Sequence, residues 1–142
     1  MIMTREGVNP PTRKTKGSCG YDISCPTDLE LCDNSWTQVD LGIRMEPGDI
    51  PEGYCALITP RSSMGMKHGL KLANTVGVID SDYTMATIKA ALKTDNGYSH
   101  GNPLRLKRND RILQMIIVPF ATIPNETVPT EKRKGGLGST GE

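Results

Sequence analysis

The sequence predicts an all-β fold: an antiparallel sandwich, jelly roll or barrel with at most one short helix. Glycine and proline are abundant, with 15 and 10 residues in a chain of 142, and turn-forming residues at this density favour short strands over long helices. Apolar runs recur between turn signals at a spacing of about eight to twelve residues, as they do in sandwiches and barrels. No segment has the pattern of a long amphipathic helix.

Individual strands follow from the alternation of apolar residues and from the turns between them. A short strand is expected within residues 1–18. Ordered structure is expected to begin at residues 20–23, and further strands are expected at residues 39–45, 54–59, 76–79, 87–92, 104–107 and 112–118. Apolar residues alternate with others within 39–45, which predicts a half-buried strand. Residues 112–118 are almost continuously apolar, which predicts a central strand, and the one short helix is expected within 61–70.

Size, charge and cysteine usage limit the function classes. A chain of 142 residues fits one domain with a single core. A net charge of +1 indicates neither a nucleic-acid footprint nor a membrane surface, so neither partner is expected. No signal peptide or long apolar run is present, which predicts a soluble protein of the cytoplasm, or of the nucleus if the source is eukaryotic or viral. Reduced structural thiols are expected rather than a zinc site, because no C-x-x-C pair occurs among Cys19, Cys25, Cys32 and Cys55.

The stretch 73–83 is the one around which the rest of the chain is organised. Its residues 76–79 predict a buried strand, which ends in two carboxylates and a phenol, Asp80, Asp82 and Tyr83. Because strand side chains alternate faces, the two carboxylates point the same way if the extended geometry continues. Such a pair can bind a hydrated metal ion, divide into acid and base, or be neutralised by arginines. A solvated β-turn with no further role is the structural alternative.

Two segments before this stretch also carry candidate chemistry. Residues 20–22 place the carboxylate of Asp22 beside a permissive glycine, where a capped turn is the plain structural reading. Residues 60–65 place Arg61 next to two serines directly after a strand, which resembles a phosphate cradle. The alternative for this second segment is a helix N-terminus with an ion-paired arginine.

Two segments after residues 73–83 also carry candidate chemistry. In residues 109–114, Gln114 interrupts an apolar strand, so its amide must bond to backbone or face a ligand. The glycines of residues 135–141 free backbone N–H groups that could wrap an anion, whereas a terminus without fixed structure is the default.

Together these five segments resemble, in order and spacing, the five motifs of the homotrimeric dUTPase family. The resemblance covers Gly17 to Gly141, and its motifs stand here as residues 19–23, 60–64, 77–83, 109–114 and 135–141. It implies a jelly-roll-like catalytic domain over residues 1–124 and a flexible C-terminal arm over residues 125–142. It also implies a homotrimer with active sites shared between subunits, in which the arm closes over a neighbour's site. The implied reaction is hydrolysis of dUTP to dUMP and pyrophosphate, with Mg2+ on the triphosphate, which keeps uracil out of DNA.

The resemblance assigns roles residue by residue. Asp80 matches the carboxylate that orients and deprotonates the attacking water, and Tyr83 matches the ring that packs on deoxyribose. The uracil-reading hairpin comprises Asn74, Gly77, Val78 and Ile79. The phosphate ligands are Ser62, Ser63 and Gln114, with Arg61 near them. Asp22 matches a carboxylate near the magnesium, acting through water, and Asp82 is expected to form a structural ion pair with an arginine.

The arm supplies the remaining expected contacts. The cation for the γ-phosphate is Lys132 or Arg133, because the usual arginine spacing before the glycines is altered. The residues expected to cover the base and phosphates are Leu137, Gly138 and Ser139.

The sequence departs from the family pattern at two places. Thr84, Met85 and Ala86 stand where Arg or Gln and then Gly usually follow the tyrosine, and Leu137 replaces an aromatic residue. A non-catalytic binding or regulatory module on the same scaffold is therefore one alternative. The related dCTP deaminases are another, but they use a catalytic glutamate, and no Glu occurs between Gly53 and Asn125.

Overall fold

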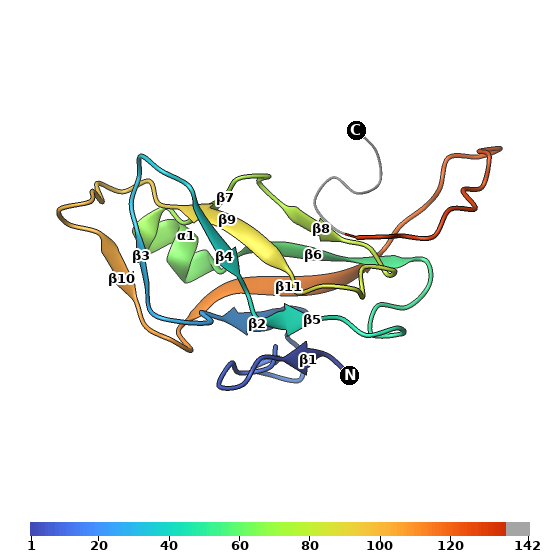
Figure 1. Ribbon diagram of the computed structural model, residues 1–142, viewed down its shortest axis with the longest axis horizontal. Helices are drawn as coiled ribbons and strands as arrows, with labels where there is room; N and C mark the ends of the chain where they lie inside the picture. Colours follow the sequence, from blue (N-terminus) through green and yellow to red (C-terminus); the bar gives the residue numbers. More distant parts are fainter. Residues whose placement is uncertain (136–142) are drawn as a thin grey trace.

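A computed structural model describes residues 1–135, which form short antiparallel strands and one helix (Figure 1). The elements in chain order are β1 (Met3–Thr4), β2 (Tyr21–Ser24), β3 (Leu29–Leu31), β4 (Thr37–Asp40), β5 (Ile43–Arg44), β6 (Tyr54–Pro60), α1 (Ser62–His68), β7 (Lys71–Leu72), β8 (Gly77–Ile79), β9 (Lys89–Lys93), β10 (Leu104–Leu106) and β11 (Arg111–Pro119). Residues 120–135 form no helix or strand.

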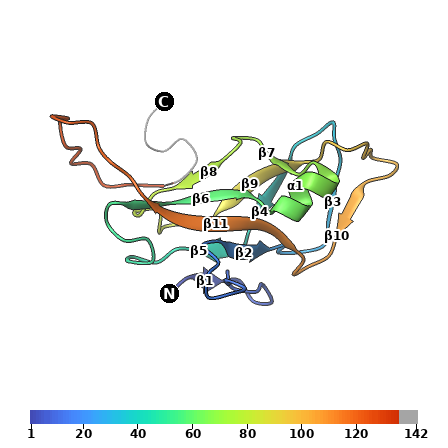
Figure 2. The ribbon, with the colours of Figure 1, turned by 180° about the vertical axis from the view of Figure 1, so that it is seen from behind.

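Two sheets face each other across the core. One has the strand order β2-β11-β6-β8 and the other β4-β9-β7, while β1-β5 and β10-β3 are two-stranded. The views from opposite sides show β4 and β9 on one side of the molecule and β11 and β6 on the other (Figures 1 and 2). The core contains Ala56 and Ile58 of β6, Leu113 and Met115 of β11, and Leu92 of β9, each at most 2% exposed. The all-β, jelly-roll-like prediction is confirmed.

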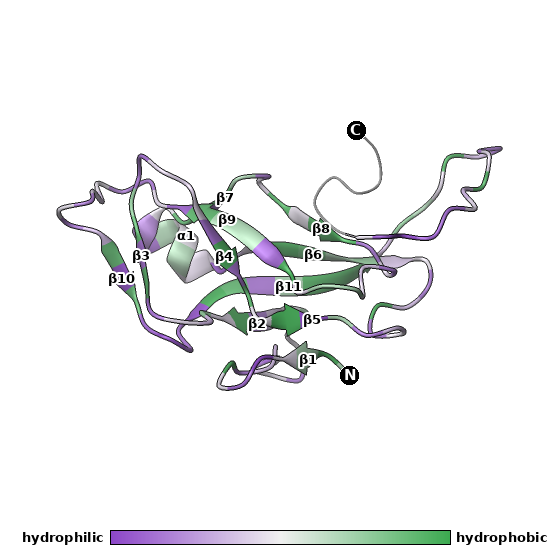
Figure 3. Ribbon diagram, viewed as in Figure 1, coloured by the Kyte–Doolittle hydropathy of each residue, from purple (hydrophilic) through white to green (hydrophobic). Residues whose placement is uncertain are grey.

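The pairing of β6 with β11 is the longest in the molecule. It runs without a break from Leu113 opposite Pro60 to Pro119 opposite Tyr54. β11 is hydrogen-bonded on its other side to β2, so the prediction of a central strand is confirmed. Because alternate residues face opposite sides, Leu57 of β6 belongs to the outer face, away from the buried Ala56 and Ile58. Figure 3 shows that β6 and β11 are apolar over much of their length.

The strand expected at residues 39–45 is interrupted. Its alternating apolar side chains are buried as expected, with Leu41 at 0% and Ile43 at 1% exposure. Gly42, however, has a φ of 69°, which a continuous strand does not allow, and the segment divides into β4 and β5. β3 and β7 were not expected from the sequence, because strands of two or three residues are too short to show an alternating pattern.

The prediction that residues 76–79 form a buried strand is wrong for two of its side chains. Val76 is 36% exposed and Val78 is 58% exposed. For Val78 the reason is that its side chain lies on the outer face of the sheet, beside the half-buried Leu57 of β6. Ile79, which points to the other face, packs against the core.

The helix falls within the expected range. α1 begins after Arg61, whose backbone is extended (φ −64°, ψ 146°), and ends at Gly69 in the left-handed region (φ 61°). The Gly69 N–H donates to the Gly65 carbonyl at 2.9 Å, and the Leu70 N–H donates to the Met64 carbonyl at 3.3 Å. These bonds satisfy the last carbonyls of the helix, as a glycine at this position typically allows.

The cysteines have the expected state. All four are free thiols, and burial raises the pKa of Cys25 to about 11, so its thiol stays protonated near neutral pH. Within residues 1–135, no helix has the length and apolar character needed to cross a membrane.

We predict a pH-dependent stability from Asp33, which closes the loop after β9. Its carboxylate accepts hydrogen bonds from the Thr94 hydroxyl (2.6 Å), the Gly97 N–H (2.6 Å) and the Asn96 N–H (3.1 Å). These bonds, with that of Thr94 the largest effect, lower the pKa of Asp33. A carboxylate with a lowered pKa stabilises the fold above its ordinary pKa of about 4, and this contribution is lost as the pH falls through the folded value.

Asp33→Asn should therefore lower the Tm at neutral pH, and its gap to the parent chain should close as the pH falls below about 4. Thr94→Val removes one of the three donors and should show part of the same trend. A Tm gap that stays constant over this pH range would contradict the assignment.

Candidate active site

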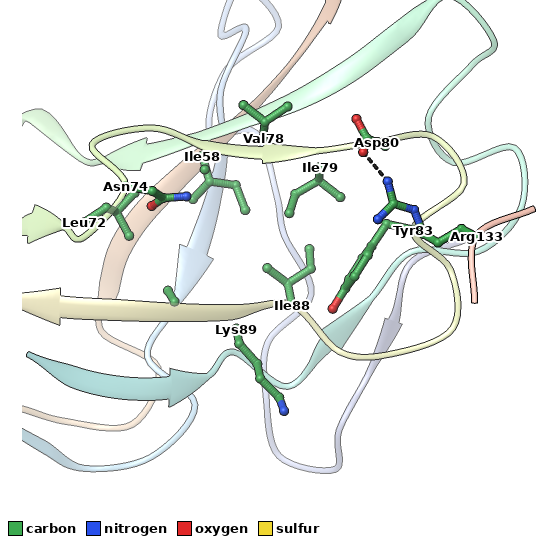
Figure 4. A pocket seen from close by; sticks show the side chains of 12 residues that line it. Ile58, Leu72, Asn74, Val78, Ile79, Asp80, Tyr83, Ile88, Lys89 and Arg133 are labelled. Carbon is green, nitrogen blue, oxygen red and sulfur yellow. Dashed lines mark hydrogen bonds and ion pairs between the residues drawn. The ribbon is translucent and has the colours of Figure 1, made fainter. Parts of the chain in front are cut away.

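A cavity of about 150 Å³ opens between β8 and β9. Its walls are mainly apolar and come from both sheets: Ile58, Leu72, Gly77, Ile79, Ile88 and Ala90. In Figure 4, Ile79 points from β8 into the cavity and Val78 points away from it. A Cβ on Gly77 would lie 3.3 Å from the Cβ of Ile58, so a glycine lets β8 approach β6 closely. Asn74, which lies before β8, places an amide on the wall.

An acidic turn, formed by residues 80–84, borders this cavity. The Tyr83 N–H donates to the Asp80 carbonyl (3.1 Å), and the Thr84 N–H donates to the Asp82 carbonyl (2.9 Å). The Nε of Arg133 contacts Asp82 at 2.7 Å, and its Nη2 binds Asp80. Both carboxylates therefore bind the guanidinium of Arg133. They lie on a turn, and not on a continuation of strand β8, which ends at Ile79. The expected ion pair of Asp82 with an arginine is confirmed.

Tyr83 connects the acidic turn to the cavity. Its hydroxyl donates to the carbonyl of Thr87 at 3.1 Å, which fixes the ring against the wall. The guanidinium carbon of Arg133 lies 5.8 Å from the centre of this ring. That distance is within the range of cation–π attraction, so the ring and the two carboxylates hold the same arginine.

A separate polar groove lies where β2, β11 and the start of α1 meet. Asp22 accepts from Arg61 Nε (2.8 Å) and Arg111 Nη1 (2.9 Å), and its side chain is only 15% exposed. Gln114 lies directly opposite Asp22 in the sheet and donates to the Pro60 carbonyl at 3.5 Å. Arg61 is thus an ion-paired arginine at a helix N-terminus, and it also lines a groove that could accept phosphate. The groove is lined by Lys14, Ser18, Cys19, Gly20, Asp22, Arg61, Ser62 and Gln114.

The β6–β8 register separates the groove from the acidic turn. Ile79 lies opposite Ala56, so Asp80 follows at the level of the start of β6. Arg61 comes directly after Pro60, at the other end of β6. Five residues of strand, from 55 to 60, correspond to about 17 Å. The register therefore places the acidic turn and the polar groove of one chain at opposite ends of β6.

The residues predicted from the sequence fall into three groups. The cavity brings together Asn74, Gly77, Val78, Ile79, Asp80, Tyr83 and Arg133. The polar groove brings together Asp22, Arg61, Ser62 and Gln114. Ser63 and Lys132 are exposed and line neither, and Leu137, Gly138 and Ser139 lie outside the described residues.

Sequence reasoning missed several residues of the two sites. Arg111 lies within residues 109–114 but was given no role, because a spacing of three residues from Gln114 predicts opposite faces of a regular strand. A register shift between Arg111 and Leu113 instead lets Arg111 reach Asp22. The apolar wall residues Leu72 and Ile88 gave no such signal, because they look like ordinary core residues.

No group of three or more His, Cys, Asp or Glu side chains that could hold a metal ion occurs within residues 1–135. Of the residues lining the polar groove, Asp22 alone is a carboxylate. The described residues therefore offer no site enclosed by protein ligands alone, and a metal ion bound here would take most of its ligands from water or from a substrate.

Comparisons with known proteins agree on one family. A family model described as dUTPase matches residues 7–141. The deoxyuridine 5'-triphosphate nucleotidohydrolase of Cutibacterium acnes is 33% identical over 135 residues, which cover 92% of this chain and 84% of the relative.

Solved structures give the same result for the fold. A dUTPase from Streptococcus mutans matches with a TM-score of 0.72 and 26% identity, covering 87% of this chain and 98% of that one. A mutant dUTPase from phage phi11 of S. aureus, described with a structural Mg(II) ion, matches with a TM-score of 0.71, covering 90% of this chain and 96% of that one. Its identity of 22% supports the fold alone.

We predict that the lack of a side chain at Gly20 lets the Gln114 amide keep its place in the polar groove. A Cβ at Gly20 would lie 2.8 Å from Oε1 of Gln114, too close for the amide to stay in place. Gly20→Ala should displace this flexible side chain, leave the Tm within about 2 °C, and weaken pyrophosphate binding about three- to tenfold, as expected for one lost hydrogen bond.

Gly17→Ala is the matched control, because a Cβ at Gly17 meets nothing within 4 Å. Calorimetric titration of both variants with pyrophosphate makes the comparison. Equal affinities in the two variants would show that Gln114 does not contact phosphate.

Proposed function

The chain belongs to the dUTPase family, and from this membership we infer that it hydrolyses dUTP to dUMP and pyrophosphate. The family match over residues 7–141 is the observation that carries this conclusion. The roles of individual residues are our proposal, supported by the geometry of the cavity, the acidic turn and the polar groove. Among the residues lining the cavity there is no glutamate of the kind that a deaminase would use.

We propose that Asp80 is the general base. Its carboxylate borders the cavity and is 56% exposed, so a water molecule can reach it. Asp80 would accept the proton of this water as the oxygen attacks the α-phosphorus of dUTP. The bond from that phosphorus to the bridging oxygen then breaks, and pyrophosphate leaves.

We propose that the cavity holds uracil and deoxyribose. Asn74 offers an amide, with a donor and an acceptor, to the polar edge of the base. The close approach of β8 at Gly77 leaves little room for an added methyl group, which would disfavour thymine. The Tyr83 ring, held by its bond to the Thr87 carbonyl, is a rigid surface for the sugar. A ribose 2′-hydroxyl would contact this ring.

The polar groove is the proposed site for the phosphates. Ser62 and Gln114 offer hydrogen-bond donors, and Arg61 supplies positive charge. The family implies Mg2+, and a single carboxylate suits an ion that is held mainly by phosphate oxygens and water. Asp22 would hold this ion through a water molecule, and the ion would neutralise part of the triphosphate charge when bound.

We propose a homotrimer whose active sites each combine the cavity of one chain with the polar groove of another. The separation of about 17 Å along β6 supports sharing, because it puts Asp80 and the proposed phosphate ligands of one chain at opposite ends of that strand. The outer face of the sheet supports the same assembly, since Leu57 lies beside Ile116 and Val78 there, and Val78 is 58% exposed. A second copy of the chain is the proposed cover for this apolar face.

Lys132 and Arg133 are the two candidate cations of the arm, and the structure supports different roles for them. Arg133 is engaged by Asp80 and Asp82, whereas Lys132 is exposed. We propose Lys132 as the cation that meets the γ-phosphate. Because the family relatives from C. acnes and S. mutans are bacterial, the cytoplasm is the compartment that we propose.

The base assignment predicts the effect of Asp80→Asn. The variant should bind nucleotide and remain folded but lose turnover by about 10²- to 10⁴-fold, as is typical when a general base is removed. Asp95→Asn, which breaks a surface ion pair with Lys71, is the control and should keep its turnover. Turnover of Asp80→Asn within about threefold of the parent would rule out Asp80 as the base.

The sugar assignment predicts a loss of selectivity in Tyr83→Ala. Removing the ring should reduce the preference for dUTP over UTP, measured as the ratio of kcat/KM values, by about tenfold or more. Tyr83→Phe keeps the ring and loses only the hydrogen bond to the Thr87 carbonyl, so it should keep most of the preference. An unchanged ratio in Tyr83→Ala would mean that another residue excludes ribose.

A further inference from the structure

The Tyr83 ring is held through the peptide group that joins Thr87 to Ile88. The carbonyl of this group accepts from the Tyr83 hydroxyl at 3.1 Å, and its N–H donates to the Ile43 carbonyl at 2.9 Å. Figure 4 shows the Tyr83 hydroxyl pointing toward the start of β9, beside Ile88. Because a peptide group is planar and rigid, the position of this one group determines where the ring lies along the cavity.

A side-chain contact fixes the same peptide group to β4. The Thr87 hydroxyl donates to Oδ2 of Asp40 at 2.9 Å. Asp40 is the last residue of β4, and its Oδ1 accepts from the Gly42 N–H at 2.9 Å. Arg5 contacts Oδ2 of Asp40 at 3.0 Å. The left-handed turn at Gly42, which separates β4 from β5, therefore helps to hold the carboxylate that Thr87 binds.

The charge of Asp40 gives this contact a direction. Partial burial acts to raise its pKa, but the hydrogen bonds from Gly42 and Thr87 and the charge of Arg5 lower the pKa of this carboxyl overall. Asp40 is therefore ionised at neutral pH and can only accept hydrogen bonds, so the Thr87 hydroxyl is the donor.

The loop between Tyr83 and Thr87 has little packing of its own. It forms no helix or strand, and Met85 within it is 67% exposed. The bond from Thr87 to Asp40 therefore ties a loosely packed loop to β4 at the end where this loop enters the cavity wall.

We propose that Thr87 and Asp40 are positioning residues for sugar selection, because they hold the Thr87 carbonyl at the place where the Tyr83 ring meets deoxyribose. Within the described part of the chain, neither residue lines the cavity, so both act through Tyr83. The contacts all lie within one chain, so the inference is the same in a monomer and in an oligomer. It rests on the proposed role of Tyr83 as the surface for the sugar.

The first test compares two substitutions of Thr87. Thr87→Val keeps the branched shape and loses the hydroxyl. It should lower the ratio of kcat/KM for dUTP over UTP about three- to fivefold, as expected for one lost hydrogen bond. The loss should appear mainly as a higher KM for dUTP, with kcat little changed. Thr87→Ser keeps the hydroxyl and should keep the ratio. An unchanged ratio in Thr87→Val would overturn the proposal.

Thr94→Val is the matched control. The Thr94 hydroxyl donates to Asp33 at 2.6 Å, and neither residue lines the cavity. This variant loses the same kind of bond, so it should lower the Tm and leave the ratio of substrates unchanged. An equal fall of the ratio in Thr94→Val would show that selectivity only follows stability, which would overturn the proposal.

Double variants test the route through Tyr83. Tyr83→Phe cuts the bond to the Thr87 carbonyl but leaves the loop anchored, so the ring keeps its place by packing. In Thr87→Val, by contrast, the Tyr83 hydroxyl follows a displaced carbonyl and draws the ring with it. Adding Thr87→Val to Tyr83→Phe should therefore change the ratio little. A further loss as large as that of Thr87→Val alone would show another route to the cavity and would overturn the assignment.

Asp40→Asn tests the other end of the contact. An amide has one acceptor oxygen for the two donors, Gly42 N–H and the Thr87 hydroxyl, so the variant should show part of the loss of Thr87→Val. The double variant of Asp40 and Thr87 should be little worse than Thr87→Val, because both changes remove one bond. Multiplicative losses would show that Asp40 acts independently of Thr87.

A measurement without substrate separates this inference from the proposed function. The chain has four tyrosines, so the ring signals of Tyr83 in protein with 13C-labelled tyrosine can be assigned by their loss in Tyr83→Phe. In the nucleotide-free protein these signals should shift in Thr87→Val and keep their positions in Thr87→Ser. Unshifted signals in Thr87→Val would overturn the inference even if Tyr83 selects deoxyribose. Shifted signals with an unchanged substrate ratio in Tyr83→Ala would instead refute the role of Tyr83 and confirm only that Thr87 positions its ring.

Discussion

The antiparallel register of β6 with its two neighbours is the constraint on which the site depends. β11 on one side aligns Gln114 with Thr59, and β2 extends the same row to Asp22. β8 on the other side aligns Ile79 with Ala56, near the opposite end of β6. A slip of one residue would turn every side chain to the other face. The register therefore fixes both the polar groove and the acidic turn, and it also keeps them apart.

The two clusters use charge in complementary ways. In the groove, Lys14 and Arg61 outnumber the single carboxylate of Asp22, which favours an anionic ligand. At the acidic turn, Asp80 and Asp82 outnumber Arg133, and each binds it through one carboxylate oxygen. The overall net charge of +1 conceals this division. An assembly that joins the groove of one chain to the cavity of another would bring the anionic substrate between them.

Much of this organisation could be predicted from the sequence, because motif order and strand alternation are local properties. The central strand, the helix and the cavity residues Asn74, Asp80 and Tyr83 were identified in this way. The exposure of Val78 could not be predicted, since it depends on the outer face of the sheet being uncovered there. An ion pair of Asp82 with an arginine was expected, but its partner Arg133 could not be identified from the sequence, because the two residues lie about fifty positions apart.

We propose that this chain hydrolyses the α–β phosphoanhydride of dUTP and selects both uracil and deoxyribose. The most direct measurement is the rate of pyrophosphate release from dUTP, dTTP, dCTP and UTP under identical conditions with Mg2+. We expect pyrophosphate and dUMP from dUTP, with a much higher kcat/KM than for the other three nucleotides. Equal rates with all four nucleotides, or release of ammonia from dCTP in place of pyrophosphate from dUTP, would contradict it.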